Sequence, residues 1–218
     1  LNLNNIMTKQ SIFLITNDSV KLAADYYQSQ GDRAVILLHQ MRTDKTSYDF
    51  LIPKLLQNGY QILALDLRGH GQSQGELSKF TDKDFQNMFS DAWAAETYLH
   101  ELNPQMKIQM IGASIGANTA LRFQEMNTVD SVVALSPGLN YHGIDPTDAN
   151  LGNIACPILY INTEGDNSAE DTRKLFNLSP LKNEKNQLKI YSGDKHGVYI
   201  LQDNPKALED VINWLNTH

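Results

Sequence analysis

The chain has 218 residues and a formal net charge of −7, and a chain of this length most often folds as one α/β or all-β domain. The acidic balance and the lack of any Lys/Arg run disfavour nucleic-acid binding, and no apolar run reaches the ~20 residues of a membrane span. Its single cysteine, Cys156, excludes an internal disulfide and is expected to be a small buried thiol.

The apolar patterns predict strands and helices that alternate along the chain. Residues 11–28 predict two strands joined by a turn at 17–19. The helix expected at 47–60 ends at Gly59 and has one apolar face made of Phe50, Leu51, Leu55 and Leu56. Further strands are expected at 33–40, 61–67, 107–112, 131–136, 157–162 and 187–192.

One long helix is predicted at 83–102, and its apolar stripe indicates core packing by Phe85, Met88, Phe89, Ala92, Trp93 and Leu99. Helices are also expected at 115–126 and 207–218. This alternation predicts a mostly parallel sheet with helices on both faces, and the first hairpin adds antiparallel strands at one edge. Ligands of such sheets bind beyond the carboxyl ends of the strands, so functional residues are expected in the loops that follow the strands.

The segment 112–116 reads GASIG, with Ser114 between two glycines. Two glycines alone suit a tight turn from strand to helix, and the same turn would expose the Ser114 hydroxyl above the sheet. The helix that starts at Ile115 would direct its positive end at negative charge developing there. The apolar strand before the motif and the helical pattern after it favour a nucleophile.

Two later loops carry an acid and a base. Asp166 follows the strand at 157–162, where a carboxylate can orient a histidine, although it can equally cap the next helix. Glu164 and Asp171 compete with it for the role of the acid. His196 lies between the last strand and the last helix, and the chain order Ser, Asp, His is that of α/β-hydrolases.

The loop after the strand at 33–40 is expected to supply one backbone N–H to an oxyanion hole, and the residue after the nucleophile supplies the other. The expected donors are therefore Met41 and Ile115. The side chain of His39 is interpreted as a structural residue that holds this loop.

The motifs GASIG, DLRGHGQS, LLHQ, TEGD and KHG occur in an order that resembles the α/β-hydrolase superfamily over nearly the whole chain. Within it, the chain looks like a small, lidless serine esterase or a dienelactone-hydrolase-like member. The resemblance implies that the loop 66–73 shapes the site without being catalytic. One departure is that His39-Gln40 stands where the family usually has His-Gly, so Gln40 is an alternative oxyanion donor to Met41.

The connection 136–157 is too short for a folded lid, so we expect an open site with no cap domain. Four of its residues can form a wall of the acyl pocket or merely cover the sheet edge: Tyr141, His142, Ile144 and Leu151.

These features predict a serine hydrolase of small to medium esters or thioesters that needs no metal or cofactor, with Ser114, Asp166 and His196 acting through an acyl-enzyme. An acyltransferase, a peptidase, a C–C hydrolase or a non-catalytic binding protein of the same fold remain alternatives. We expect one domain over 1–218, a monomer or a weak dimer, and a cytoplasmic location, unless a leader once preceded Leu1.

Overall fold

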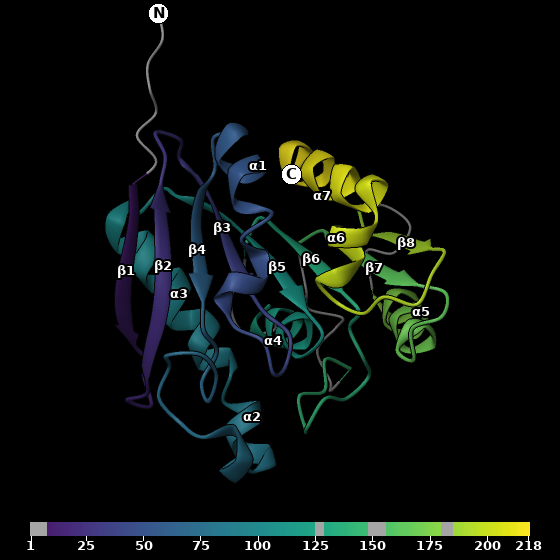
Figure 1. The fold of residues 1–218 in the computed structure, drawn as a ribbon, viewed down its shortest axis with the longest axis horizontal. Coiled ribbons are helices and arrows are strands. Elements are labelled where there is room, and N and C mark those ends of the chain that lie inside the picture. Colours follow the sequence, from purple (N-terminus) through teal and green to yellow (C-terminus); the bar gives the residue numbers. More distant parts are fainter. Residues whose placement is uncertain (1–7, 125–128, 148–155, 180–184) are drawn as a thin grey trace, which may run out of the picture.

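The computed structural model describes residues 8–124, 129–147, 156–179 and 185–218. They form an eight-stranded sheet with the order β1-β2-β4-β3-β5-β6-β7-β8 (Figure 1). The strands are β1 (Thr8–Ile15), β2 (Lys21–Gln28), β3 (Arg33–Leu38), β4 (Gln61–Leu65), β5 (Lys107–Ala113), β6 (Ser131–Leu135), β7 (Ile158–Thr163) and β8 (Gln187–Tyr191).

The pairing of β1 with β2, and of β2 with β4, is antiparallel, whereas all the remaining pairs are parallel. This confirms the predicted mostly parallel sheet with an antiparallel hairpin at one edge. The carboxyl ends of β3, β5, β6, β7 and β8 therefore meet at one edge of the sheet, where the loops with the predicted site residues begin.

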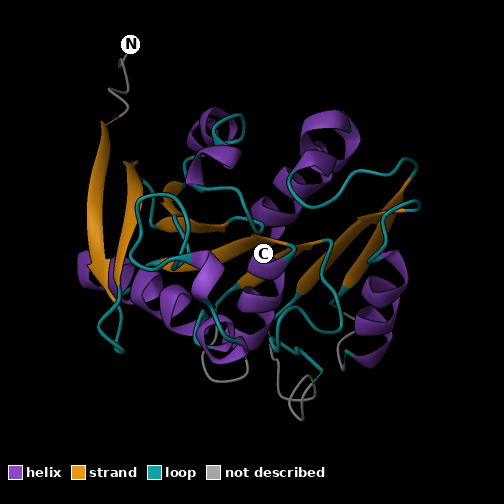
Figure 2. Ribbon diagram, turned by 60° about the horizontal axis from the view of Figure 1, so that its bottom comes forward, coloured by secondary structure: helices purple, strands orange, loops and turns teal. Residues whose placement is uncertain are grey.

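Helices cover both faces of the sheet (Figure 2). The α-helices are α1 (Ile52–Gln57), α2 (Asp82–Gln86), α3 (Phe89–Leu102), α4 (Ile115–Phe123), α5 (Ala169–Leu178), α6 (Tyr199–Asp203) and α7 (Pro205–Thr217). Apolar side chains of α3, α4 and α5 pack on one face, and those of α1, α6 and α7 pack on the other.

The central strands are buried on both faces because their successive side chains enter two different cores. In β3, Ala34, Ile36 and Leu38 face the layer of α3 and α4. Val35 and Leu37 face the layer of α1 and α7. The continuous apolar run at 33–38 thus reflects burial on both sides, as its sequence predicts.

Two predicted helices differ from those observed. The helix expected at 47–60 begins only at Ile52, with Pro53 in its first turn, after a short 3-10 turn at Lys45–Tyr48. The helix expected at 83–102 is divided into α2 and α3. Phe85 of α2 is buried in the same core as the apolar residues of α3, and its ring packs against Phe80 and His142.

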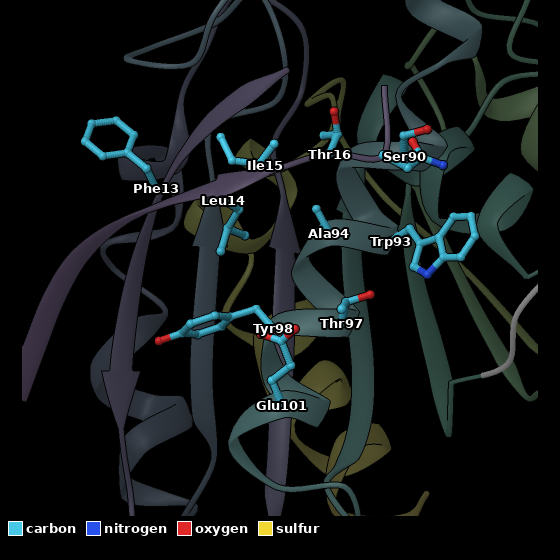
Figure 3. Close-up of a pocket in the computed structure, with 11 residues that line it drawn as sticks. Phe13, Leu14, Ile15, Thr16, Ser90, Trp93, Ala94, Thr97, Tyr98 and Glu101 are labelled. Atoms are coloured by element: carbon cyan, nitrogen blue, oxygen red, sulfur yellow. The ribbon is translucent and has the colours of Figure 1, made fainter. Parts of the chain in front are cut away.

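Trp93 corrects the predicted core stripe of α3, because its side chain is 39% exposed. It lines a hollow of about 570 Å³ between β1 and α3, which Figure 3 shows in close-up. The hollow also exposes Ile15 and Tyr98 and contains none of the predicted site residues. Since β1 is the outermost strand, three strands separate it from β5, the strand that leads to Ser114.

Candidate active site

Ser114 lies on the sharp turn between β5 and α4, with a φ of 52° and a ψ of −116°. A positive φ is strained for a residue with a side chain and is seen where function holds a residue in place. The flanking glycines permit the turn, since a Cβ on Gly112 would collide with the Gly116 carbonyl. A Cβ on Gly116 would collide with the carbonyl of Leu38. The side chain of Ser114 therefore sits on a closely packed strand-turn-helix unit.

The structure brings Asp166 and His196 together from the loops after β7 and β8. The Nδ1 atom of His196 lies 2.8 Å from Oδ2 of Asp166. The two competing carboxylates are placed differently: Glu164 is exposed, and Asp171 accepts a hydrogen bond from the backbone of Leu139 at 3.2 Å. Of the three acids, Asp166 is the one in a position to orient the imidazole of His196.

The environment of Asp166 favours its ionised form. Burial raises the pKa of this carboxyl, but hydrogen bonds from His196, from Ser136 and from the N–H of Ser168 leave the pKa below its usual value. Oδ1 of Asp166 also accepts the N–H of Ser168 at 3.0 Å, but Ser168 is itself the N-cap of α5, which begins at Ala169. Asp166 therefore holds the turn before this helix and is not its cap.

Ser136 is a site residue that the sequence analysis missed. Its hydroxyl lies 2.7 Å from Oδ2 of Asp166 and accepts the N–H of Gly197 at 2.9 Å. Its φ is 49°, again in the region that a residue with a side chain rarely adopts. The available signal was its place directly after β6, at the edge of the sheet where the other strands deliver their polar residues.

The loop that carries His196 also packs against the turn that carries Ser114. A Cβ on Gly197 would lie 3.4 Å from the Cβ of Ala113, the residue before Ser114. The phenol of Tyr141 donates to the carbonyl of Ser136. Burial raises its pKa, while the nearby side chains of Ser168 and Ser114 oppose this rise.

The predicted oxyanion donors are available for a ligand. Within the described part of the chain, the backbone N–H groups of Met41, Ile115 and Gln40 donate to no protein acceptor. The side chain of Gln40 is turned toward the histidine loop, where its Oε1 accepts the N–H of Val198 at 3.0 Å. The alternative donor at Gln40 is therefore its backbone N–H, since its side chain is turned to the histidine loop.

His39 holds the loop after β3, as its sequence position predicts. Its Nε2 accepts the N–H of Leu67 at 3.0 Å, so its Nδ1 carries the proton and donates to the carbonyl of Gln40 at 2.7 Å. Burial lowers the pKa of His39 to about 4, and the ring is neutral near pH 7.

The loop 66–73 is also pinned from inside. Asp66 is fully buried and accepts from the backbone and the ammonium of Lys45, each at 2.8 Å, and from the N–H of Gln72 at 2.9 Å. The two bonds from Lys45 join the loop after β4 to the loop after β3, and the bond from Gln72 closes the loop after β4 on itself. Asp66 is thus committed to structure, in keeping with the non-catalytic role that the resemblance implies for this loop.

Three of the four residues expected at the wall lie in the described part of the chain. Tyr141 donates to the carbonyl of Ser136 at 3.2 Å, and its ring lies on Gly138, where a Cβ would be 2.7 Å from the ring. The amide of Asn118 bonds both backbone groups of Gly138, at 2.8 and 3.1 Å, and so clamps this loop onto α4. His142 instead stacks on Phe85. Ile144 is buried, and Leu151 lies outside the described residues.

Three further observations bear on the chemistry of the site. Among the described residues, no group of three or more His, Cys, Asp or Glu side chains is arranged to hold a metal ion. None of the described helices is long and apolar enough to cross a bilayer. Cys156 is buried, and burial raises the pKa of its thiol to about 12.

Comparison with known structures finds the same fold. An esterase of Pyrococcus furiosus superposes with a TM-score of 0.83 at 23% identity, covering 97% of this chain and 91% of that chain. An esterase of Exiguobacterium antarcticum superposes with a TM-score of 0.74 at 13% identity, covering 95% of this chain and 100% of that chain.

Sequence comparison identifies the family. An uncharacterized protein of Rickettsia prowazekii (strain Madrid E) is 30% identical over 170 residues, which cover 72% of this chain and 67% of that protein. The family model described as serine aminopeptidase, S33, matches residues 29–151, which is more than half of the chain. The chain therefore belongs to the serine aminopeptidase S33 family of the α/β-hydrolase superfamily.

Proposed function

We propose that this protein is a serine hydrolase that cleaves carboxylic ester or thioester bonds of small to medium acyl substrates. The observation that carries the proposal is the hydrogen bond of 2.8 Å between His196 and Asp166, made on a loop that packs against the turn of Ser114. A base oriented by a buried carboxylate, on a loop that lies next to the turn of a serine, is the arrangement that activates a hydroxyl for attack.

The proposed reaction assigns one role to each of the three residues. Ser114 attacks the acyl carbonyl and passes its proton to Nε2 of His196, while Asp166 holds the ring by Nδ1 and stabilises the imidazolium. His196 then protonates the leaving alcohol or thiol, which departs as the acyl-enzyme forms. A water molecule, deprotonated by the same ring, attacks the acyl-enzyme and releases the acid.

The negative oxygen of each tetrahedral intermediate would be bound by backbone N–H groups. Ile115 supplies one donor, and the positive end of α4 reinforces it. Met41 supplies the second, with the N–H of Gln40 as the alternative. The supporting observation is that these groups have no acceptor in the described part of the chain.

An ester or thioester is proposed as the substrate because the structural relatives named above are esterases. The family name also points to a peptidase, which would use the same three residues, and acyl transfer or C–C cleavage would do so too. We propose one catalytic domain over 1–218 that requires no metal or cofactor.

Turnover of a panel of substrates tests this function. We expect hydrolysis of p-nitrophenyl acetate and butyrate and of a short acyl thioester, and little hydrolysis of aminoacyl p-nitroanilides. Ser114→Ala should abolish turnover, and Asp166→Asn should reduce it by about 10⁴-fold because an amide favours the wrong tautomer of the imidazole.

Glu164→Gln is the matched control for the acid, because Glu164 lies two residues away in the same loop. It should retain near wild-type turnover. If Glu164→Gln alone abolished turnover, the assignment of the acid would be wrong. Cleavage of the anilides but not of the esters would replace the esterase proposal by the peptidase alternative.

A further inference from the structure

The loop that carries His196 is fastened by three side chains from other strand ends. The hydroxyl of Thr163 donates to the backbone carbonyl just before His196 at 2.7 Å. The hydroxyl of Ser136 accepts the first N–H after His196 at 2.9 Å, and Oε1 of Gln40 accepts the second at 3.0 Å. Backbone groups on both sides of the histidine are thus held in place.

Gln40 differs from Thr163 and Ser136 because it comes from a more distant part of the sheet. Thr163 and Ser136 come from β7 and the end of β6, which lie close to β8 in the sheet. Gln40 follows β3, on the far side of β5, and reaches across the end of β5 to the histidine loop. The segment from which it reaches is the one that carries the proposed oxyanion donor Met41.

The backbone of Gln40 is itself fixed. Its carbonyl accepts from Nδ1 of His39 at 2.7 Å and from the hydroxyl of Thr43 at 2.8 Å. The residue as a whole is only 8% exposed. A buried side chain on a pinned backbone has little freedom, so a bond from its tip transmits position from one loop to the other.

The amide of Gln40 and the glycine at 197 fit each other. Gly197 has a φ of 59°, and a Cβ added to it would collide with Oε1 of Gln40. The amide therefore occupies the space that any side chain at 197 would need. The orientation of the Gln40 amide is set by its partner, because the N–H of Val198 can donate only to the amide oxygen and not to the amide nitrogen.

We propose that Gln40 is a positioning residue for His196. Its side chain ties the loop with the backbone donors to the loop with the base, and so fixes the separation between these groups across Ser114. The catalytic consequence rests on the proposed hydrolase function, whereas the anchoring of the loop does not. Glutamine at position 40, in place of the glycine of His-Gly, would then add a side-chain contact to the histidine loop that glycine cannot make.

Three variants test this role. Gln40→Met keeps the length of the side chain and removes the acceptor, and Gln40→Glu restores an acceptor oxygen with a negative charge. Gln109→Met is the matched control, because Gln109 is a buried glutamine that bonds Ser131 and the backbone of Leu215 away from the site. Amide hydrogen exchange of the segment 193–200 is measured by mass spectrometry, together with kcat, KM and the pH profile of ester hydrolysis.

We expect Gln40→Met to speed exchange in 193–200 and to lower kcat by about tenfold, the equivalent of one hydrogen bond, with KM nearly unchanged. Gln40→Glu should return the exchange toward wild type. It should also move the acidic limb of kcat/KM to higher pH, because a carboxylate near His196 favours the imidazolium. Gln109→Met should change neither the exchange in this segment nor the pH profile.

Wild-type exchange and wild-type kcat in Gln40→Met would overturn the proposal, and so would equal loosening of 193–200 by Gln109→Met. Faster exchange in Gln40→Met with unchanged kcat and pH profile would leave only a structural tie and overturn the positioning role. If the wild-type protein hydrolysed none of the substrates, the proposed function would fail, and the exchange data would still decide whether Gln40 holds the loop.

Discussion

The hydroxyl of Ser136 lies 2.7 Å from Oδ2 of Asp166, the same oxygen that bonds His196. This carboxylate oxygen is therefore shared by a base and by a hydroxyl from the neighbouring strand end. Because the Ser136 hydroxyl also accepts the N–H after His196, one side chain connects the acid to the backbone of the histidine loop. Both connections would be lost together if the hydroxyl were removed.

Ser136→Ala is expected to lower the free energy of unfolding by about 1–3 kcal/mol, because a buried N–H and a buried carboxylate each lose a partner. The pKa of Asp166 should rise toward its usual value, since one of the bonds that lower it is gone. Urea unfolding measures the loss of stability, and kcat for an ester shows whether the altered carboxylate still supports turnover. Unchanged stability and unchanged kcat would show that the hydroxyl holds neither group.

Gly197→Ala is expected to damage the site through two separate effects. The φ of 59° strains a residue with a Cβ by about 1–2 kcal/mol, and the Cβ meets the amide of Gln40. In the double variant Gln40→Ala/Gly197→Ala the collision is gone, while the backbone strain and the loss of the bond to Val198 remain, so the two substitutions should be non-additive by about 0.5–3 kcal/mol. Additive losses in urea unfolding would mean that the amide and the glycine do not share this space.

The sequence predicted those parts of the fold in which burial determines the order of apolar and polar residues. Central strands such as 33–38 are apolar throughout because they meet a core on each side. The division between α2 and α3 was not predictable from the apolar stripe, which continues through both, and neither was the stacking of Phe85 on His142, 57 positions further along the chain. Periodicity within one segment carries no information about such a distant partner.

The same limit applies to the candidate site. Ser114, Asp166 and His196 stand out because their residue types and chain order match a known chemistry. Ser136 has no such signature, and the direction of the Gln40 side chain depends on Val198, which is 158 positions away. Residues that position others are visible only once the strand ends have been brought together.

His39 predicts a dependence of stability on pH. Burial holds its pKa at about 4 in the folded protein, against about 6.5 when unfolded. Between these values the unfolded chain binds the extra proton, so His39 makes the folded protein less stable as the pH falls from 7 to 5. The expected loss from this residue is about 2 kcal/mol.

The comparison with His39→Gln isolates this contribution, because other groups that titrate on unfolding, such as His70 and Asp91, are present in both proteins. Urea unfolding at pH 7 and pH 5 should show a decline in wild type that exceeds the decline in His39→Gln by about 2 kcal/mol. Equal declines in the two proteins would mean that His39 is not held neutral in the fold.

The central claim is that Ser114 is the nucleophile, and covalent labelling tests it most directly. A fluorophosphonate should add one phosphonyl group per chain, located at Ser114 by peptide mapping with mass spectrometry. Ser114→Ala should remain unlabelled, and Asp166→Asn should be labelled much more slowly than wild type because its imidazole is held in the wrong tautomer. A folded wild-type protein that stays unlabelled, or an adduct on another residue that persists in Ser114→Ala, would contradict the account.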